Sequence, residues 1–222
     1  MRRVFIVFSA FWVSFVSAEQ QLEPREIAAI AREAVVTVTV LQDGEASGQG
    51  SGFVLQADGI IVTNLHVVSG ASSLSIKLAS GEIYDNVYVL GHDARRDVAV
   101  LKIPAVGLAS LAVGNDREVE IGDSVYVMGS PLGLSGTFSD GLLSAKRTED
   151  GSIRLQISAP LSEGSSGGPV LNSSGEVIGI ATSFFSRGQN LNIAMPARYA
   201  EGLVSVAGTP VPFADSSLAE IP

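Results

Sequence analysis

The stretch SGFVLQADGIIVT at residues 51–63 decides the expected fold, because it joins two short β-prone segments through a tight turn. Ser51 to Gln56 and Gly59 to Thr63 contain the Phe, Val, Ile and Thr residues that favour strands. The strands are joined across Ala57-Asp58-Gly59, and the Asp58-Gly59 pair supplies the positive φ that a tight hairpin requires. The stretch therefore predicts a β-hairpin.

Similar segments follow one another along the rest of the chain, separated by turn signals roughly every 8 to 12 residues. Strands are predicted at residues 35–40, 74–79, 83–90, 98–103, 124–128, 138–145, 153–158, 169–171 and 177–182. Amphipathic patterns predict helices only near the ends, at residues 24–34 and 196–206. This pattern indicates an all-β barrel or sandwich, with a crossing between two β halves near residues 107–120.

The composition excludes several classes of function. The chain has 222 residues, of which 46% are hydrophobic, so it can bury a sizeable core. Its net charge of -9 disfavours nucleic-acid binding, because an acidic surface repels phosphates. The absence of cysteine and the presence of only two histidines disfavour a metal centre, and we expect neither a metal nor another cofactor.

Residues 1–18 are predicted to be a signal peptide. Arg2 and Arg3 precede an apolar run from Val4 to Val16, and small residues lead to Ala18. The run is shorter than the roughly 20 residues that span a bilayer, so cleavage is favoured over an uncleaved anchor, with no stable membrane span afterwards. An exported protein without cysteine suits the bacterial periplasm or secretion, by either the general or the twin-arginine route.

The stretch GSSGGP at residues 164–169 is the strongest candidate for chemistry. It is either an ordinary polar turn or the turn of a nucleophilic serine. Glycines allow such a turn to point neighbouring backbone N–H groups at one spot and to admit a substrate backbone.

A serine nucleophile needs a base, and only His66 and His92 are available. His66 follows a predicted strand, whereas His92 lies in a polar turn. Asp97, just before another strand, is a candidate to orient an imidazole. The chain order His66, Asp97, Ser166 is that of the chymotrypsin-type hydrolases.

Several separated motifs together resemble the HtrA/Deg branch of the trypsin-like serine proteases. They are GSGFV at 50–54, DGIIVTNLHVV at 58–68, DVAVLKI at 97–103, GSPLGL at 129–134 and SGGP at 166–169. The resemblance covers residues 35–198. It implies two orthogonal six-stranded β-barrels with an active-site cleft between them. The implied limits are a protease domain at 19–207, barrels at about 35–112 and 121–196, and a loose tail at 208–222.

The resemblance also assigns roles to residues. It implies Ser166 as nucleophile, His66 as general base and acid, and Asp97 as the orienting group. The backbone N–H groups of Gly164 and Ser166 would form the oxyanion hole. An uncharged specificity pocket, suited to small or medium apolar side chains, would be lined by Pro160, Ile180, Ala181 and Thr182, with Phe184 and Phe185 beyond it.

The implied function is an endopeptidase that cleaves partly unfolded envelope or secreted proteins through an acyl-enzyme intermediate. The alternative is a pseudoprotease or holdase that binds extended peptides without cleaving them.

The sequence departs from the family pattern at three places. About 20 residues follow Ala200, too few for the PDZ domain that relatives carry. Glu163 replaces the family's proline before Gly164, and Ser165 replaces an asparagine. Relatives form trimers through N-terminal aromatic contacts, but residues 19–34 contain no aromatic residue, so a homo-oligomer stays open.

Overall fold

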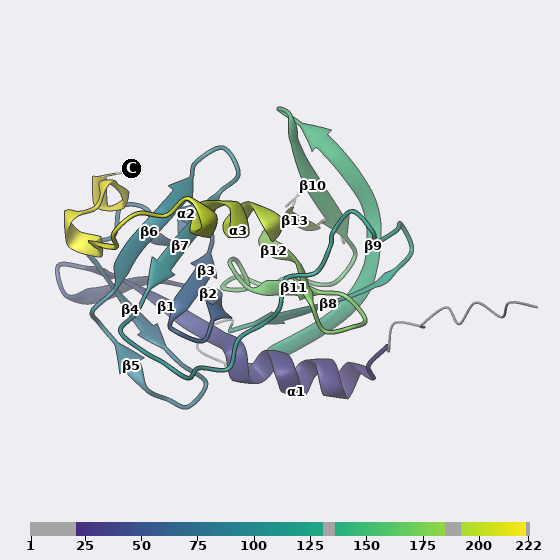
Figure 1. Ribbon diagram of the computed structural model, residues 1–222, viewed down its shortest axis with the longest axis horizontal. Coiled ribbons are helices and arrows are strands. Elements are labelled where there is room, and N and C mark those ends of the chain that lie inside the picture. Colours follow the sequence, from purple (N-terminus) through teal and green to yellow (C-terminus); the bar gives the residue numbers. More distant parts are fainter. Residues whose placement is uncertain (1–20, 131–135, 185–191, 221–222) are drawn as a thin grey trace, which may run out of the picture.

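The computed structural model of the protein describes residues 21–130, 136–184 and 192–220. Its strands form two halves that lie side by side, with one helix running beneath both (Figure 1). The all-β prediction is therefore confirmed. Residues 1–18, the predicted signal peptide, lie outside the described residues. Within the described ranges, no helix is long and apolar enough to cross a membrane.

The N-terminal half is one eight-stranded sheet with the order β14-β6-β7-β3-β2-β1-β4-β5. Its strands are β1 (Val35–Gln42), β2 (Glu45–Gln56), β3 (Ile60–Thr63), β4 (Ser73–Lys77), β5 (Ile83–Tyr84), β6 (Tyr88–Asp93), β7 (Val98–Lys102) and β14 (Val211–Pro212). This differs from the expected closed six-stranded barrel, because the two-residue strands β5 and β14 are the sheet edges and do not pair with each other.

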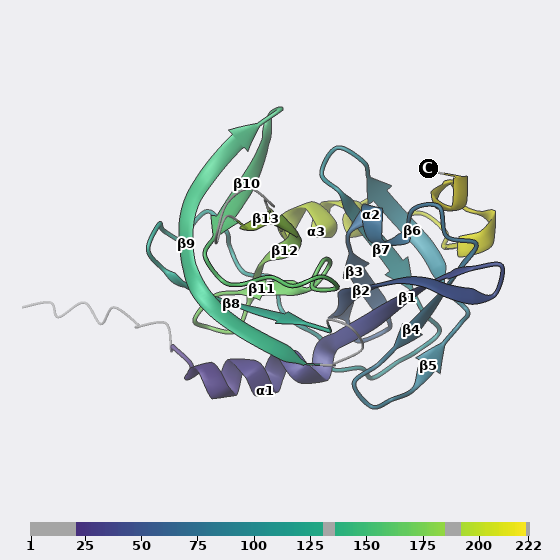
Figure 2. The same cartoon turned by 180° about the vertical axis from the view of Figure 1, so that it is seen from behind.

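The C-terminal half is a closed six-stranded barrel with the order β10-β13-β12-β11-β8-β9 (Figure 2). Its strands are β8 (Ser124–Gly129), β9 (Thr137–Glu149), β10 (Ser152–Ile157), β11 (Pro169–Leu171), β12 (Val177–Phe184) and β13 (Asn192–Pro196). The sequence analysis did not predict β13, since its five residues are buried throughout and show no alternation.

The predicted hairpin is confirmed as β2 and β3, in which Phe53 pairs with Val62. Gly59 closes the turn with φ of 95°, the left-handed conformation that the Asp-Gly pair predicts. β3 is buried along its whole length because both faces are covered. Ile61 points into the core of the N-terminal half, whereas Ile60 and Val62 point into the core between the halves.

That central core explains why the two halves hold together. It combines Phe53 and Val100 from the N-terminal half with Met128, Leu171 and Ile180 from the barrel. The barrel has its own separate core, which includes Leu143, Leu155 and Ile157. Side chains alternate between these cores along the strands, so packing fixes the position of each strand end that meets the other half.

The helix α1 (Pro24–Ala34) confirms the predicted N-terminal helix. Pro24 stands in the first turn, and Glu23 and Glu26 form a capping box. Its buried face, Ile27, Ala31 and Ala34, packs into the central core. The helix therefore contacts both halves.

The C-terminal residues differ from the expected loose tail. After α3 (Arg198–Ser205), β14 adds to β6, and the 3-10 turns η2 (Phe213–Asp215) and η3 (Ser217–Glu220) follow. Phe213 and Leu218 are buried in the N-terminal core, and the Leu218 carbonyl accepts a hydrogen bond from the Gly70 N–H. Burial of these two apolar side chains outweighs the turn-rich composition of the tail.

Candidate active site

His66 and Asp97 are joined by two contacts. The short helix α2 (Leu65–Val68) carries His66 directly after β3, and Asp97 directly precedes β7. Asp97 Oδ1 accepts the backbone N–H of His66 at 2.8 Å, and Oδ2 lies 2.6 Å from the imidazole Nδ1. The carboxylate therefore fixes both the helix and the ring, leaving Nε2 as the ring nitrogen available to another group.

The turn before Asp97 is held by ionic and aromatic contacts. Asp97 itself has φ of 54°, which aspartate tolerates better than most residues. Arg96 pairs with Asp93 and stacks over the ring of Tyr199 in α3, with its Cζ 4.3 Å from the ring centroid. Burial acts to raise the pKa of Asp93, but the hydrogen bonds and charge of Arg96 together lower it below its usual value. These contacts brace the segment that presents Asp97.

Ser166 lies on the glycine-rich turn between β10 and β11. Gly167 follows it with φ of 88°, and a Cβ there would lie only 2.1 Å from the Ser51 carbonyl oxygen. Gly167 is therefore required both for the backbone conformation and for the close approach to β2. The Ser51 N–H donates to the Ser166 carbonyl at 2.8 Å across the junction of the two halves.

The Ser166 hydroxyl is bound to a carbonyl rather than to the histidine. Its Oγ donates to the backbone oxygen of Thr182 at 3.2 Å, and no hydrogen bond joins it to His66. Asn64 connects the two sides, since its Nδ2 donates to Thr182 Oγ1 and to the Asp97 carbonyl, both at 2.9 Å. The three predicted residues are thus linked, with Ser166 turned toward β12.

Two backbone N–H groups beside Ser166 are available. Those of Gly164 and Ser166 donate to no acceptor among the described residues, whereas the intervening Ser165 N–H donates to Ser162 O at 2.9 Å. Gly164 has φ of 88°. The free N–H groups of Gly164 and Ser166 therefore lie on either side of the Gly164–Ser165 peptide unit, whose own N–H is hydrogen-bonded.

The other predicted residues are placed as follows. Ile180 and Ala181 are fully buried in the cores, whereas Thr182 is half-buried beside Ser166. Pro160 is exposed, and its carbonyl accepts the Ser139 hydroxyl at 2.8 Å. Phe185 and the side chain of Phe184 lie outside the described part of the structure.

The structure also describes the positions of His92 and Glu163. His92 lies within β6 opposite Ala99, and among the described residues it forms no hydrogen bond or ion pair with a carboxylate, whereas His66 is paired with Asp97. Glu163 is exposed on the turn before Gly164.

Sequence reasoning missed two buried polar residues, Ser51 and Asn64. Both are fully buried and form hydrogen bonds between the two halves. Neither position stands out in the sequence, because Ser51 lies between Gly50 and Gly52 of β2 and Asn64 lies between β3 and α2. Their partners could not be deduced from spacing.

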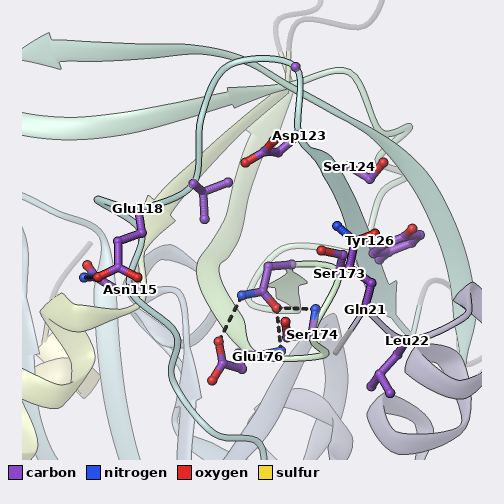
Figure 3. A pocket seen from close by; sticks show the side chains of 13 residues that line it. Gln21, Leu22, Asn115, Glu118, Asp123, Ser124, Tyr126, Ser173, Ser174 and Glu176 are labelled. Atoms are coloured by element: carbon purple, nitrogen blue, oxygen red, sulfur yellow. Dashed lines mark hydrogen bonds between the residues drawn. The ribbon is translucent and has the colours of Figure 1, made fainter. Parts of the chain in front are cut away.

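A separate polar cavity of about 420 Å³ is lined by none of His66, Asp97 and Ser166 (Figure 3). Glu118, Asp123 and Glu176 lie around it, and Asn172 Nδ2 donates to Glu176 at 3.0 Å. Neither a histidine nor a glycine-rich serine turn lines it. The chemistry of the Ser166 region therefore has no counterpart there.

The comparison with known families decides the assignment. A model of the trypsin-like peptidase domain matches residues 50–180, more than half of the chain. This chain belongs to the trypsin-like peptidase family. The match contains all three residues that the resemblance singled out.

The relatives of this trypsin-like peptidase are HtrA/DegP-like serine proteases. A putative serine protease HhoB of Synechocystis is 36% identical over 169 residues, covering 72% of this chain and 40% of the relative. A probable periplasmic serine endoprotease, DegP-like, of Brucella suis is 44% identical over 144 residues, covering 62% of this chain and 28% of the relative. The chain thus spans less than half the length of these curated relatives.

A solved structure supports the same placement. The serine endoprotease from Yersinia pestis aligns with a TM-score of 0.74 at 31% identity, over 83% of this chain and 68% of that one. The fold of this chain is therefore similar to that of a solved serine endoprotease.

Proposed function

We propose that this trypsin-like peptidase is a serine endopeptidase that uses Ser166, His66 and Asp97. The two-point contact between Asp97 and His66 carries the proposal, because it sets the tautomer that a general base needs. With a proton on Nδ1 facing Asp97, the Nε2 lone pair is free to accept the Ser166 proton. The alternative base, His92, is not paired with a carboxylate among the described residues.

The proposed reaction begins when the Ser166 hydroxyl leaves the Thr182 carbonyl and turns to His66. Ser166 Oγ attacks the substrate carbonyl while His66 takes its proton, and the N–H groups of Gly164 and Ser166 receive the developing oxyanion. His66 then protonates the leaving amine, which leaves an acyl-enzyme. A water molecule, deprotonated by His66, hydrolyses that ester and restores Ser166.

We propose that the substrates are partly unfolded exported proteins. We also propose that this chain is itself exported and that its own signal peptide is removed after residue 18. The periplasmic DegP-like relatives support this location. Ser166 is only partly exposed, and Ser165, Gly167 and Gly168 around it are buried, so a substrate has to reach it as an extended segment, which a compact folded protein does not offer.

The function is tested with a fluorophosphonate probe, which reacts only with an activated serine. We expect the wild-type protein to be labelled at Ser166 and the Ser166→Ala variant to remain unlabelled. A wild-type protein that binds unfolded polypeptide without labelling or cleavage would replace this proposal with the holdase alternative.

The specificity prediction follows from the uncharged residues beside the site. Neither Pro160 nor Thr182 carries a charge that would attract Lys or Arg at the cleaved position. We expect a peptide-library profile dominated by small or medium apolar side chains. A profile dominated by Lys or Arg would contradict the pocket assignment.

Glu163 is predicted to weaken the resting oxyanion hole. It directly precedes Gly164, and its carboxylate raises the energy of nearby negative charge. It also leaves φ free at a position where proline would fix it. We therefore propose that substrate completes the order of the Glu163–Gly164 peptide unit, which carries the Gly164 N–H.

Two substitutions separate these causes. If charge dominates, Glu163→Gln raises kcat at low salt, and the gain shrinks as salt screens the carboxylate in the wild type. If backbone freedom dominates, Glu163→Pro raises kcat and Glu163→Gln does not. Wild-type kcat and kcat/KM in both variants would mean that the resting turn is already formed.

A further inference from the structure

We propose that Ser51 is a positioning residue that holds the oxyanion hole from the opposite half of the molecule. This inference rests on the proposed function. Ser51 stands in β2 between Gly50 and Gly52, is fully buried, and pairs with Thr37 of β1. It belongs to the N-terminal sheet, whereas the turn that it contacts belongs to the barrel.

Every polar atom of Ser51 forms a hydrogen bond. Its hydroxyl donates to the Gly164 carbonyl at 2.6 Å and accepts the Ser130 N–H at 2.8 Å. Its backbone N–H donates to the Ser166 carbonyl at 2.8 Å, and its carbonyl accepts the Thr63 hydroxyl at 2.7 Å. Ser51 therefore has no freedom to rotate without breaking a buried hydrogen bond.

These contacts fix alternate peptide units of the nucleophile turn. The Gly164–Ser165 unit is held at both ends, its carbonyl by the Ser51 hydroxyl and its N–H by Ser162 O. The Ser166–Gly167 unit is likewise held by the Ser51 N–H and by Ala181 O. The Ser166 N–H lies on the peptide unit between these two.

The positions of the two free N–H donors, those of Gly164 and Ser166, follow from the peptide units that are held next to them. With its neighbours fixed on both sides, the unit that carries the Ser166 N–H has little freedom to rotate that donor away. The Gly164 N–H lies on the preceding unit, which adjoins the one that the Ser51 hydroxyl holds. The Gly164 carbonyl accepts the Ser51 hydroxyl, whereas the Gly164 N–H donates to no acceptor among the described residues and stays available to an oxyanion.

Ser51 is itself held by a further hydrogen-bonded pair, Ser130 and Thr37. Ser130, at the end of β8, donates its N–H to Ser51 and shares a hydrogen bond of 2.6 Å between its hydroxyl and that of Thr37. Thr37 does not contact the nucleophile turn. It therefore provides a matched control: a buried hydroxyl in the same network, which is connected to the Ser51 hydroxyl only through Ser130.

The test compares Ser51→Ala, Ser51→Thr and Thr37→Val with the wild type in steady-state cleavage of an apolar peptide substrate. We expect Ser51→Ala to lower kcat by roughly 10- to 100-fold with little change in KM, since the oxyanion forms only after binding. Ser51→Thr, which keeps the hydroxyl, should recover most of the loss. Thr37→Val should lower thermal stability while kcat stays within about threefold of the wild type.

A second readout separates positioning from general damage. A peptide aldehyde forms a hemiacetal oxyanion in the same hole, so its inhibition constant should rise in Ser51→Ala by the factor by which kcat/KM falls. If Ser51→Ala does not fold, Ser51→Cys, with its weaker donor, should show the same effect in part.

The outcomes are distinguishable from failure of the proposed function. An inert wild type that the fluorophosphonate does not label would overturn both proposals. An active wild type with unchanged kcat and aldehyde affinity in Ser51→Ala would overturn only the role of Ser51. Equal losses of kcat in Ser51→Ala and Thr37→Val would show that the network acts through stability alone.

Discussion

Replacing Ser166 by alanine is expected to lower kcat by about 10⁶-fold, as removal of a triad nucleophile does in comparable enzymes. The side chain contributes only its hydroxyl, which donates to the Thr182 carbonyl at 3.2 Å. Because the hydroxyl is not part of a core, the variant should fold normally. Cleavage of an unfolded protein and circular dichroism, measured on the same sample, check the two statements.

His66→Ala is the companion variant. Triad members act as a unit, so the two losses should be similar and the double variant no worse than either. His92→Ala serves as the control, because His92 has no carboxylate partner. Loss of activity in His92→Ala with retention in His66→Ala would show that the base is assigned wrongly.

Replacing Asp97 by asparagine is expected to lower kcat by roughly 10⁴-fold at neutral pH. The amide oxygen can still accept the His66 backbone N–H, so α2 should stay in place. The amide NH₂ would then face His66 Nδ1, which can only accept from it. The ring proton would move to Nε2, and the nitrogen facing Ser166 would no longer accept a proton.

Asp93→Asn is the matched control for this variant. Asp93 lies four residues earlier in the same hairpin and pairs with Arg96 rather than with the histidine. It should therefore cost some stability without the loss of kcat. If both asparagine variants lost activity equally, the effect would come from the hairpin and not from the tautomer of His66.

The positions of most strands could be predicted because their signals are local. The Asp58-Gly59 turn and the β-branched run of Val35 to Val40 determine their own conformations, and the structure confirms both. The strand at Asn192–Pro196 could not be predicted in this way. It is buried on both faces, and only its neighbours β10 and β12 make it a strand.

The closure of each half also depended on long-range pairing. Side-chain patterns specify that a strand has two buried faces, but not whether the last strand of a sheet meets the first. In the N-terminal half, two-residue strands stand at both edges and the sheet stays open. In the barrel, β9 extends over 13 residues and pairs with both β8 and β10.

The sequence by itself determined the residue types, the turn glycines and the chain order of His66, Asp97 and Ser166. Only the tertiary structure decided that His66 rather than His92 meets the carboxylate, and that Ser166 rests on Thr182. It alone joined Ser51 to a turn more than a hundred residues away. Turn and strand preferences act between neighbours in the chain, whereas these hydrogen bonds exist only after packing has brought the two halves together.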